Sequence, residues 1–395
     1  MKHILLGTSA LVAAGLMIAP ANAAEKIKLG LGGFYNASMG ANFGGDDDDI
    51  DSPADTSSES GAYHNNFDIH QNIEVHVKGE TTLDNGITVG AHIEFEGDDD
   101  AERIDESWAY FSGGFGEIRF GSDDAAPLQT CVGEAGSVTA NFGVASPNEA
   151  FNNAGDNGLA GVGSFGSCYG TAGDGLKILY YTPQFGPFNF VVSFAPEANA
   201  DDKGPTTSTS FDGGPGDTGD TQEDEIGVGM NFTHEGNGFS LLGSLGASWI
   251  TDDTADDEKG EFYQAGLQVG FGAWTIGVGG EILNNYNDAF GVTTTGGGDV
   301  VADTSDLWTA QIGGNYAWDA WTIGLGWTHG QMEITSGSDE DTIDYISLNG
   351  SYALGPGIAL EGNIGYVNYD EDTDSATNPA DYDAFEVGFG TAISF

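Results

Sequence analysis

Apolar residues recur at every second position along most of this sequence, and this alternation limits the possible folds more than any other feature. Near the start, Leu29 and Leu31 belong to a row of apolar odd positions, whereas Lys26 and Lys28 begin a row of even positions that is mostly polar or small. A β-strand directs successive side chains to opposite faces. The period of two therefore predicts two-faced strands rather than amphipathic helices, whose period is 3.6 residues.

Turns and loops divide the alternating sequence into sixteen segments. Short turn signals such as Asp84-Asn85-Gly86 reverse the chain between some segments, whereas acidic, glycine-rich stretches such as 44–61 and 197–224 separate others. An even number of strands, with short turns at one end and long loops at the other, is typical of outer-membrane barrels. We therefore predict an all-β fold, a 16-stranded antiparallel transmembrane β-barrel.

A soluble β-sandwich and a repeat solenoid would also alternate. Sixteen sandwich strands would usually divide among several domains, yet no linker divides this sequence. A solenoid would show a fixed short period, whereas the loops here differ in length. Beyond the N-terminal region no segment offers roughly 18 uninterrupted apolar residues, so strands must do any membrane spanning.

The N-terminal residues have the pattern of an export signal. Lys2-His3 gives a positive start, residues 4–18 are largely apolar, and Ala21-Asn22-Ala23 supplies a small-residue cleavage site. The alternative, an uncleaved anchor, requires a longer apolar stretch of about 20 residues. We expect residues 1–23 to be a signal peptide and residues 24–395 to form the barrel.

The charge of the chain restricts its partners. It carries 62 Asp and Glu residues against 9 Lys and Arg residues, a net charge of -53. Nucleic acid is excluded as a partner because two polyanions repel each other. Carboxylates that line a channel concentrate cations and exclude anions, and salt screens this effect. The alternative is that the acidity is an adaptation to a saline habitat with no role in selectivity.

Aromatic residues at the apolar positions of the strands predict girdles at the two membrane interfaces. The residues expected on the lipid-facing side are Tyr35, Trp108, Tyr110, Tyr180, Trp249, Trp274, Tyr316, Trp321, Trp327, Tyr352 and Tyr366.

Two segments resemble the Gram-negative general porins. Residues 106–121, which read ESWAYFSGGFGEIRFG, look like the fourth and fifth strands of that family. Residues 177–186, KILYYTPQFG, resemble the strand that follows the constriction loop in its alphaproteobacterial branch. The last strand alternates up to Phe395 and resembles the sorting signal read by barrel-assembly machinery.

The resemblance implies a homotrimeric diffusion pore in the outer membrane of a Gram-negative bacterium, with a third loop that folds inward and narrows the channel. The expected partners are outer-membrane lipid and lipopolysaccharide, further copies of the chain, and small hydrophilic solutes and ions. An enzyme is not expected, because no spacing singles out a nucleophile, a His and an orienting group.

The predicted constriction loop spans residues 122–175. The alternative for this stretch is an ordinary solvated acidic loop. Its acidic residues, with no Lys or Arg among them, are Asp123, Asp124, Glu134, Glu149, Asp156 and Asp174.

The resemblance also implies a basic wall that faces this loop and produces a transverse field, as charged rings do in selective pores. Few arginines are available for it, so we do not expect anion preference. The candidates, all at polar positions of the first six strands, are Lys26, Lys28, Lys78, Arg103, Arg119, Lys177, His70, His76 and His92.

The two cysteines, Cys131 and Cys168, both lie in the predicted constriction loop. An exported chain meets an oxidising compartment, so we expect a disulfide that holds the shape of the loop. The alternative is two free thiols.

Runs of carboxylates at 46–49, 98–100 and 223–225 could hold calcium or magnesium, since both ions favour several oxygen ligands. No run has the spacing of a calcium loop, and diffuse counterion binding is the alternative. No other cofactor is expected. We therefore predict a passive, cation-preferring channel. The alternatives are a substrate-specific channel of the same class and a soluble secreted calcium-binding β-protein.

Overall fold

The computed structural model describes residues 26–44, 67–97, 104–144, 168, 175–196, 224–251, 259–284, 304–334, 339–370 and 381–395. The predicted signal peptide lies outside these residues. The described residues form sixteen strands and one helix: β1 (Lys28–Gly44), β2 (Phe67–Thr82), β3 (Thr88–Glu96), β4 (Ser107–Gly113), β5 (Gly116–Ser122), α1 (Ala126–Thr130), β6 (Leu176–Tyr181), β7 (Phe188–Ala195), β8 (Glu225–Glu235), β9 (Phe239–Thr251), β10 (Lys259–Phe271), β11 (Trp274–Asn284), β12 (Thr304–Trp318), β13 (Trp321–Ile334), β14 (Asp339–Gly355), β15 (Ile358–Asp370) and β16 (Asp381–Ser394).

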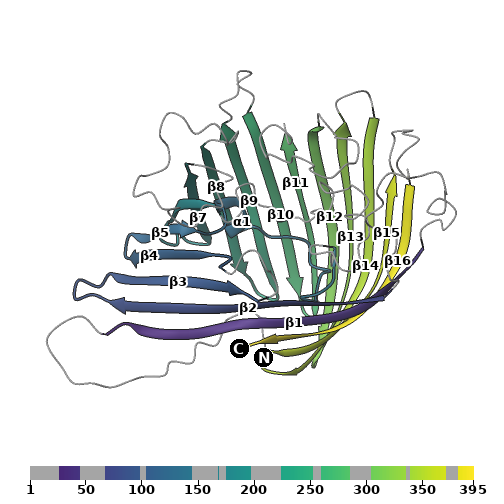
Figure 1. The fold of residues 1–395 in the computed structure, drawn as a ribbon, viewed down its shortest axis with the longest axis horizontal. Helices are drawn as coiled ribbons and strands as arrows, with labels where there is room; N and C mark the ends of the chain where they lie inside the picture. The colour runs from purple at the N-terminus through teal and green to yellow at the C-terminus, as the bar shows by residue number, and fades with distance from the viewer. Residues whose placement is uncertain are drawn as a thin grey trace, which may run out of the picture.

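The strands form one closed antiparallel barrel. Each strand pairs with its neighbours in chain order, and β1 pairs with β16 to close the sheet, from Phe34 opposite Ser394 to Gly44 opposite Ala384. Figure 1 shows this wall, in which the first and last strands lie side by side. Closure leaves no free sheet edge, so every strand is paired on both sides. The predicted 16-stranded antiparallel barrel is confirmed.

The two faces of the wall differ in polarity as the alternation predicts. One face carries exposed aliphatic side chains, such as Leu29 (67% exposed) and Leu245 (55% exposed). The other carries buried polar side chains, such as Ser38, Gln264 and Asn349. In the part of the chain that the structure describes, no helix is long and apolar enough to cross a membrane. The apolar face is the surface that a barrel presents to lipid, and we call the opposite face the polar wall.

The prediction that Trp108 and Tyr110 face lipid is wrong. Trp108 lies opposite His92 in the β3–β4 register, and their rings stack 4.4 Å apart, so both lie on the polar wall. Tyr110 donates a 2.7 Å hydrogen bond to Glu80 and is only 5% exposed. Strand β4 carries apolar residues at both parities, Phe111 among them, so alternation alone does not assign its faces.

The chain leaves β5 and packs against the polar wall. Residues 123–144, which we call the loop segment, begin at the end of β5 and include α1. Helix α1 contacts β7, β8 and β9. Its Ala126 forms a small buried apolar cluster with Leu179 of β6 and Val191 of β7. These three residues join the start of the loop segment to the wall beside β5.

The rest of the loop segment continues across further strands of the polar wall. The main-chain NH of Val132 donates to Ser244 of β9 over 2.9 Å. Asn315 of β12 donates to the carbonyl of Ala135 over 2.6 Å, and Gln311 donates to that of Val144 over 3.0 Å. Side chains of the wall therefore satisfy the main-chain groups of a segment that has almost no secondary structure of its own.

Candidate functional site

The register places most of the predicted basic residues on the polar wall. His70, His76 and Lys78 of β2 lie at alternate positions, and His92 of β3 is paired with Lys78. Lys28, Arg119 and Lys177 share this face through their partners in β2, β4 and β5. Lys26 precedes β1 and is exposed. Arg103 lies outside the described residues.

Carboxylates of the same wall lie beside these basic groups. Lys78 Nζ is 3.2 Å from Glu80, and Arg119 Nε is 2.7 Å from Glu117. His92 Nε2 is 2.7 Å from Glu94. The charges of Lys78 and Arg119 are therefore balanced locally, by carboxylates on their own strands. None of these three carboxylates was among the predicted site residues, although each stands at a polar position two residues from a predicted basic residue.

Arg119 is the centre of a cluster of two aromatic rings and two carboxylates on this wall. Its guanidinium lies 5.1 Å from the ring of Trp108 and 4.3 Å from the ring of Tyr181, within range of cation–π attraction. It donates to Glu117 over 2.7 Å and to Asp123 over 2.9 Å. An arginine held by two rings and two carboxylates has a fixed position and direction.

Asp123 was predicted to stand opposite the basic wall. It instead belongs to this cluster, beside Arg119, so that prediction is wrong. It follows β5 directly and therefore stays beside Arg119. Its side chain is 1% exposed, and Gln129 donates to it over 2.7 Å. Burial raises the pKa of the Asp123 carboxyl, and the charge of Arg119 opposes this rise. Lys177 donates to the main-chain carbonyl of Asp123 and, over 2.8 Å, to that of Gly175.

The remaining acidic residues of the predicted constriction loop are only partly described. Glu134 is buried, and it accepts hydrogen bonds from the main-chain NH groups of Gly136 and Ser137, the latter over 2.8 Å. Its charge is therefore held within the loop segment. Asp124 is half-buried and also has an interaction partner. The other three, Glu149, Asp156 and Asp174, lie outside the described residues.

Two buried carboxylates on β15 and β16 were missed by the sequence analysis. Glu361 accepts from the main-chain NH groups of Ala140 (2.9 Å) and Asn141 (3.1 Å), and from the Asn141 side chain (2.7 Å). Glu386 accepts from Asn363 over 2.8 Å and from the Tyr345 hydroxyl. Both stand at polar positions of their strands, which was the available signal. The far end of the loop segment is thus fastened by a carboxylate of the wall.

Cys131 and Cys168 form a disulfide, with their Cα atoms 5.6 Å apart. The bond joins the end of α1 to a residue 37 positions later in the same loop. This is the pairing that the sequence analysis predicts.

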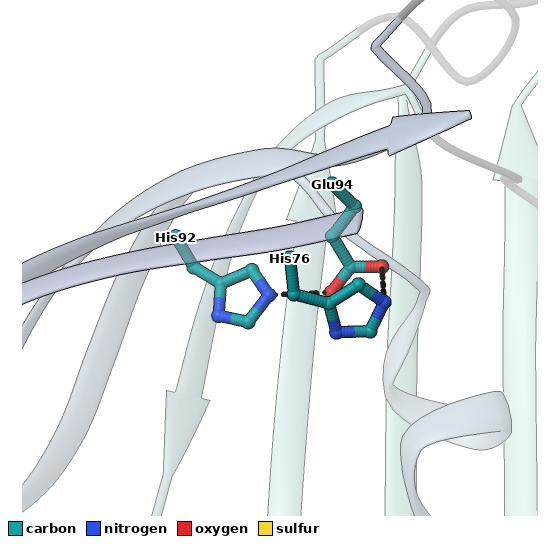
Figure 2. Close-up of side chains that lie close together, drawn as sticks. All are labelled: His76, His92 and Glu94. Carbon is teal, nitrogen blue, oxygen red and sulfur yellow. Dashed lines mark ion pairs between the residues drawn. The ribbon is translucent and has the colours of Figure 1, made fainter. Parts of the chain in front are cut away.

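Residues with metal-binding chemistry gather on β2 and β3. His76, His92 and Glu94 each offer one ligand atom, and these three atoms lie within 4.8 Å of one another. Figure 2 shows the Glu94 carboxylate between the two imidazole rings, with one oxygen turned toward each ring. Of the acidic runs expected to hold calcium or magnesium, 46–49 and 98–100 lie outside the described residues, and only Asp224 and the buried Glu225 of the third run, 223–225, are described.

Comparisons with known proteins agree with this architecture. The family model of the Gram-negative porins matches residues 7–372. No curated protein matches the chain. Among solved structures, the anion-selective porin from Comamonas acidovorans is similar with a TM-score of 0.57 and 16% identity, covering 94% of this chain and 100% of that one.

Two further structures are similar over the same extent. The outer membrane channel DcaP of Acinetobacter baumannii has a TM-score of 0.59 and 14% identity, with 94% of this chain and 98% of that one covered. The trimer form of OmpT from Vibrio cholerae has a TM-score of 0.57 and 13% identity, with coverage of 94% and 100%. At these identities the structures show a shared fold, and the family model carries the assignment. The chain belongs to the Gram-negative porin family.

Proposed function

We propose that this porin forms a water-filled channel for passive diffusion of small hydrophilic solutes and that it prefers cations. Family membership and the barrel fold place the protein in the outer membrane as a channel. The observation that supports cation preference is the charge of the polar wall and the loop segment. Lys28, Lys78, Arg119 and Lys177 stand there against a larger set of carboxylates: Glu74, Glu80, Glu94, Glu117, Asp123, Glu134, Glu225, Glu281, Glu361 and Glu386.

The carboxylate excess gives the preference a physical basis. A wall of one dominant sign raises the local concentration of counterions. The effect extends over about 10 Å at 0.1 M salt and only about 3 Å at 1 M. Cation preference should therefore be strong at low ionic strength and weak at high ionic strength. A saline-habitat role for the acidity predicts no such preference.

We further propose that the loop segment narrows the aqueous path. Its contacts with the polar wall extend from Ser193 of β7 to Glu361 of β15, which supports a course inside the barrel. We also propose a homotrimer that contacts outer-membrane lipid and lipopolysaccharide through its apolar face. The similar OmpT structure is described as a trimer. Cross-linking and native mass measurement in detergent test this assembly, and a monomer in both would contradict it.

The reversal potential of the protein in planar bilayers under a salt gradient tests the cation preference. The expected sign is that of a cation-selective pore, and the magnitude should fall as both salt concentrations rise. Glu80→Gln removes one negative charge from the polar wall and should lower the cation-to-anion permeability ratio at low salt. Asp319→Asn is the matched control. It removes the same charge from the exposed turn between β12 and β13, where the positive φ of 48° suits Asn as well as Asp. A reversal potential of the opposite sign would contradict the proposal.

A substrate-specific channel remains the second candidate within this class. Swelling of liposomes in sugars of graded size separates the two. A general channel shows a smooth decline of rate with solute size, whereas a specific channel favours one solute against this trend. The soluble calcium-binding alternative does not agree with the family assignment.

A further inference from the structure

We propose that His76, His92 and Glu94 form a binding site for a divalent transition-metal ion of the zinc class on the polar wall. The site lies on two neighbouring strands, β2 and β3. Glu94 is directly opposite His76 in their register, and His92 is two residues from Glu94 on the same face. Adjacent strands fix these backbone positions, so the three side chains are brought together by regular sheet geometry.

The distances suit a metal with small side-chain adjustments. His92 Nε2 lies 2.7 Å from one Glu94 oxygen, and His76 Nε2 lies 3.8 Å from the other. Ligand atoms of a tetrahedral zinc ion, at about 2.0–2.2 Å from the metal, are roughly 3.3 Å apart. The three ligand atoms here lie within 4.8 Å. The His92 distance is shorter than this value and the His76 distance is longer, so a small shift of the Glu94 carboxylate away from His92 and toward His76 brings both closer to it.

The polar atoms of the cluster are incompletely satisfied. Nε2 of His76 and Nε2 of His92 are both buried, and among the described residues no hydrogen bond is aligned on either atom. One carboxylate oxygen of Glu74 is also buried without a hydrogen-bond partner among the described residues. Buried polar atoms usually have a partner, and a bound ion can supply one where the protein does not. A cation between the two rings would give each nitrogen a ligand bond.

The charge around the cluster also favours a cation. Glu74, Glu94 and Asp105 bring carboxylate oxygens within 4.8 Å of one another. Among the described residues, the ion-pair partners of Glu74 and Glu94 are His76 and His92, with no Lys or Arg. Like charges at this separation repel each other. A divalent ion would remove this repulsion, and Glu74, 3.2 Å from His76 Nε2, could supply the fourth ligand.

Aromatic neighbours hold the imidazole rings in place. The ring of His92 stacks on Trp108 at 4.4 Å with an angle of 4° between the planes. The ring of His76 makes an edge contact with His92 at 5.4 Å and with Phe34 at 6.2 Å. Ligands whose orientation is fixed by their surroundings lose less freedom when they bind a metal.

The donor set selects among metals. Imidazole nitrogen suits zinc, copper and nickel, whereas calcium and magnesium prefer oxygen ligands. Two His residues and one carboxylate, with a fourth position for Glu74 or water, form a donor set that zinc accepts. The site therefore differs in chemistry from the acidic runs that the sequence suggests for calcium or magnesium.

Isothermal titration of the untagged, detergent-solubilised protein with Zn²⁺ tests the site. The titration is done in excess Ca²⁺, which occupies carboxylate-only sites. We expect one Zn²⁺ bound per chain. His76→Gln and His92→Gln should each weaken binding by about tenfold or more, because each removes a nitrogen ligand. His329→Gln is the matched control and should leave binding unchanged, since His329 has a carboxylate 3.1 Å away, from Asp344, but is outside the proposed site.

Tryptophan fluorescence locates the bound ion independently. Cu²⁺ bound beside His92 should quench Trp108, so the quench should be smaller in Trp108→Phe. Retention of the barrel in each variant is checked by heat-modifiable electrophoresis. Absence of Zn²⁺ binding in calcium, or equal affinity in wild type and a folded His76→Gln/His92→Gln double variant, would overturn the proposal. These readouts do not depend on channel activity, so failure of the metal site is distinguishable from failure of the proposed function.

Discussion

The guanidinium of Arg119 donates a 2.9 Å hydrogen bond to the carboxylate of Asp123, and this contact joins the end of β5 to the start of the loop segment. Arg119 is held by the rings of Trp108 and Tyr181, and Asp123 also accepts from Gln129 of α1. The course of the loop segment is therefore set from its first residue. Its contacts with the barrel are side-chain hydrogen bonds, the apolar cluster around Ala126 and close main-chain packing, and the disulfide joins it to a later residue of the same loop.

Arg119→Gln should destabilise the protein strongly. It leaves the buried Asp123 carboxylate without its charged partner, and the loss of one member of a buried pair costs about 3–5 kcal/mol. Urea unfolding in detergent micelles measures this change. Lys78→Gln is the control, because Lys78 and Glu80 are substantially exposed and such a pair contributes less than about 1 kcal/mol. Equal losses in the two variants would contradict a special role for Arg119.

Removal of the disulfide should destabilise the loop. The bond between Cys131 and Cys168 spans 37 positions, and a closed loop of this size contributes roughly 3–4 kcal/mol in the chain-entropy model. The double variant Cys131→Ser/Cys168→Ser should unfold at a lower temperature than the oxidised wild type. Reductant should lower the unfolding temperature of the wild type and leave that of the double variant unchanged. Intact mass before and after reduction checks the bond itself, because reduction adds two hydrogen atoms, that is, two protons and the two electrons supplied by the reductant. No gain in mass would mean that the thiols are free in the purified protein.

Close packing of the loop segment on β10 requires Gly266. A Cβ atom at this position would lie 1.6 Å from the carbonyl oxygen of Val132, far inside any allowed contact. Gly266→Ala should therefore displace the loop segment and cost on the order of 1–3 kcal/mol. Gly350→Ala is the matched control, since a Cβ there meets nothing within 4 Å. Thermal unfolding of both variants is the measurement. Loop displacement should lower the unfolding temperature of Gly266→Ala alone, whereas a general effect of replacing a strand glycine would lower the unfolding temperatures of both variants equally.

Glu361 should control how firmly the far end of the loop segment is attached. Glu361→Gln keeps the size of the side chain but removes the charge that accepts hydrogen bonds from Ala140 and Asn141. Hydrogen bonds to charged groups contribute about 1.5–3 kcal/mol. In single-channel recordings we expect larger current fluctuations, because the end of the segment is held less tightly. Asp319→Asn, in the exposed turn between β12 and β13 and outside these hydrogen bonds, should leave the recordings unchanged. Current fluctuations of wild-type size in Glu361→Gln would show that other contacts are enough to hold the end of the loop segment.

The periodicity of the sequence predicted the barrel because a strand exposes alternate residues to opposite surroundings. Rows of apolar residues such as Leu29 and Leu31 fit a lipid-facing surface. Lys78 and Arg119 stand at the alternate positions of their strands, which places them on the opposite, polar face. The prediction was wrong where a strand is short and apolar on both sides, as at Trp108 and Tyr110. There the pairing with β3, and not the local pattern, decides which face a residue occupies.

The sequence by itself determined the strand number, the two faces of the wall and the pairing of its two cysteines, because these follow from local alternation and residue type. Only the tertiary structure decided which charged groups meet. Asp123 lies beside Arg119 instead of across from it, and Glu361 holds main-chain groups more than 200 positions earlier in the chain. Such contacts depend on closure of the barrel and on the route of the loop segment, and no local pattern encodes either of them.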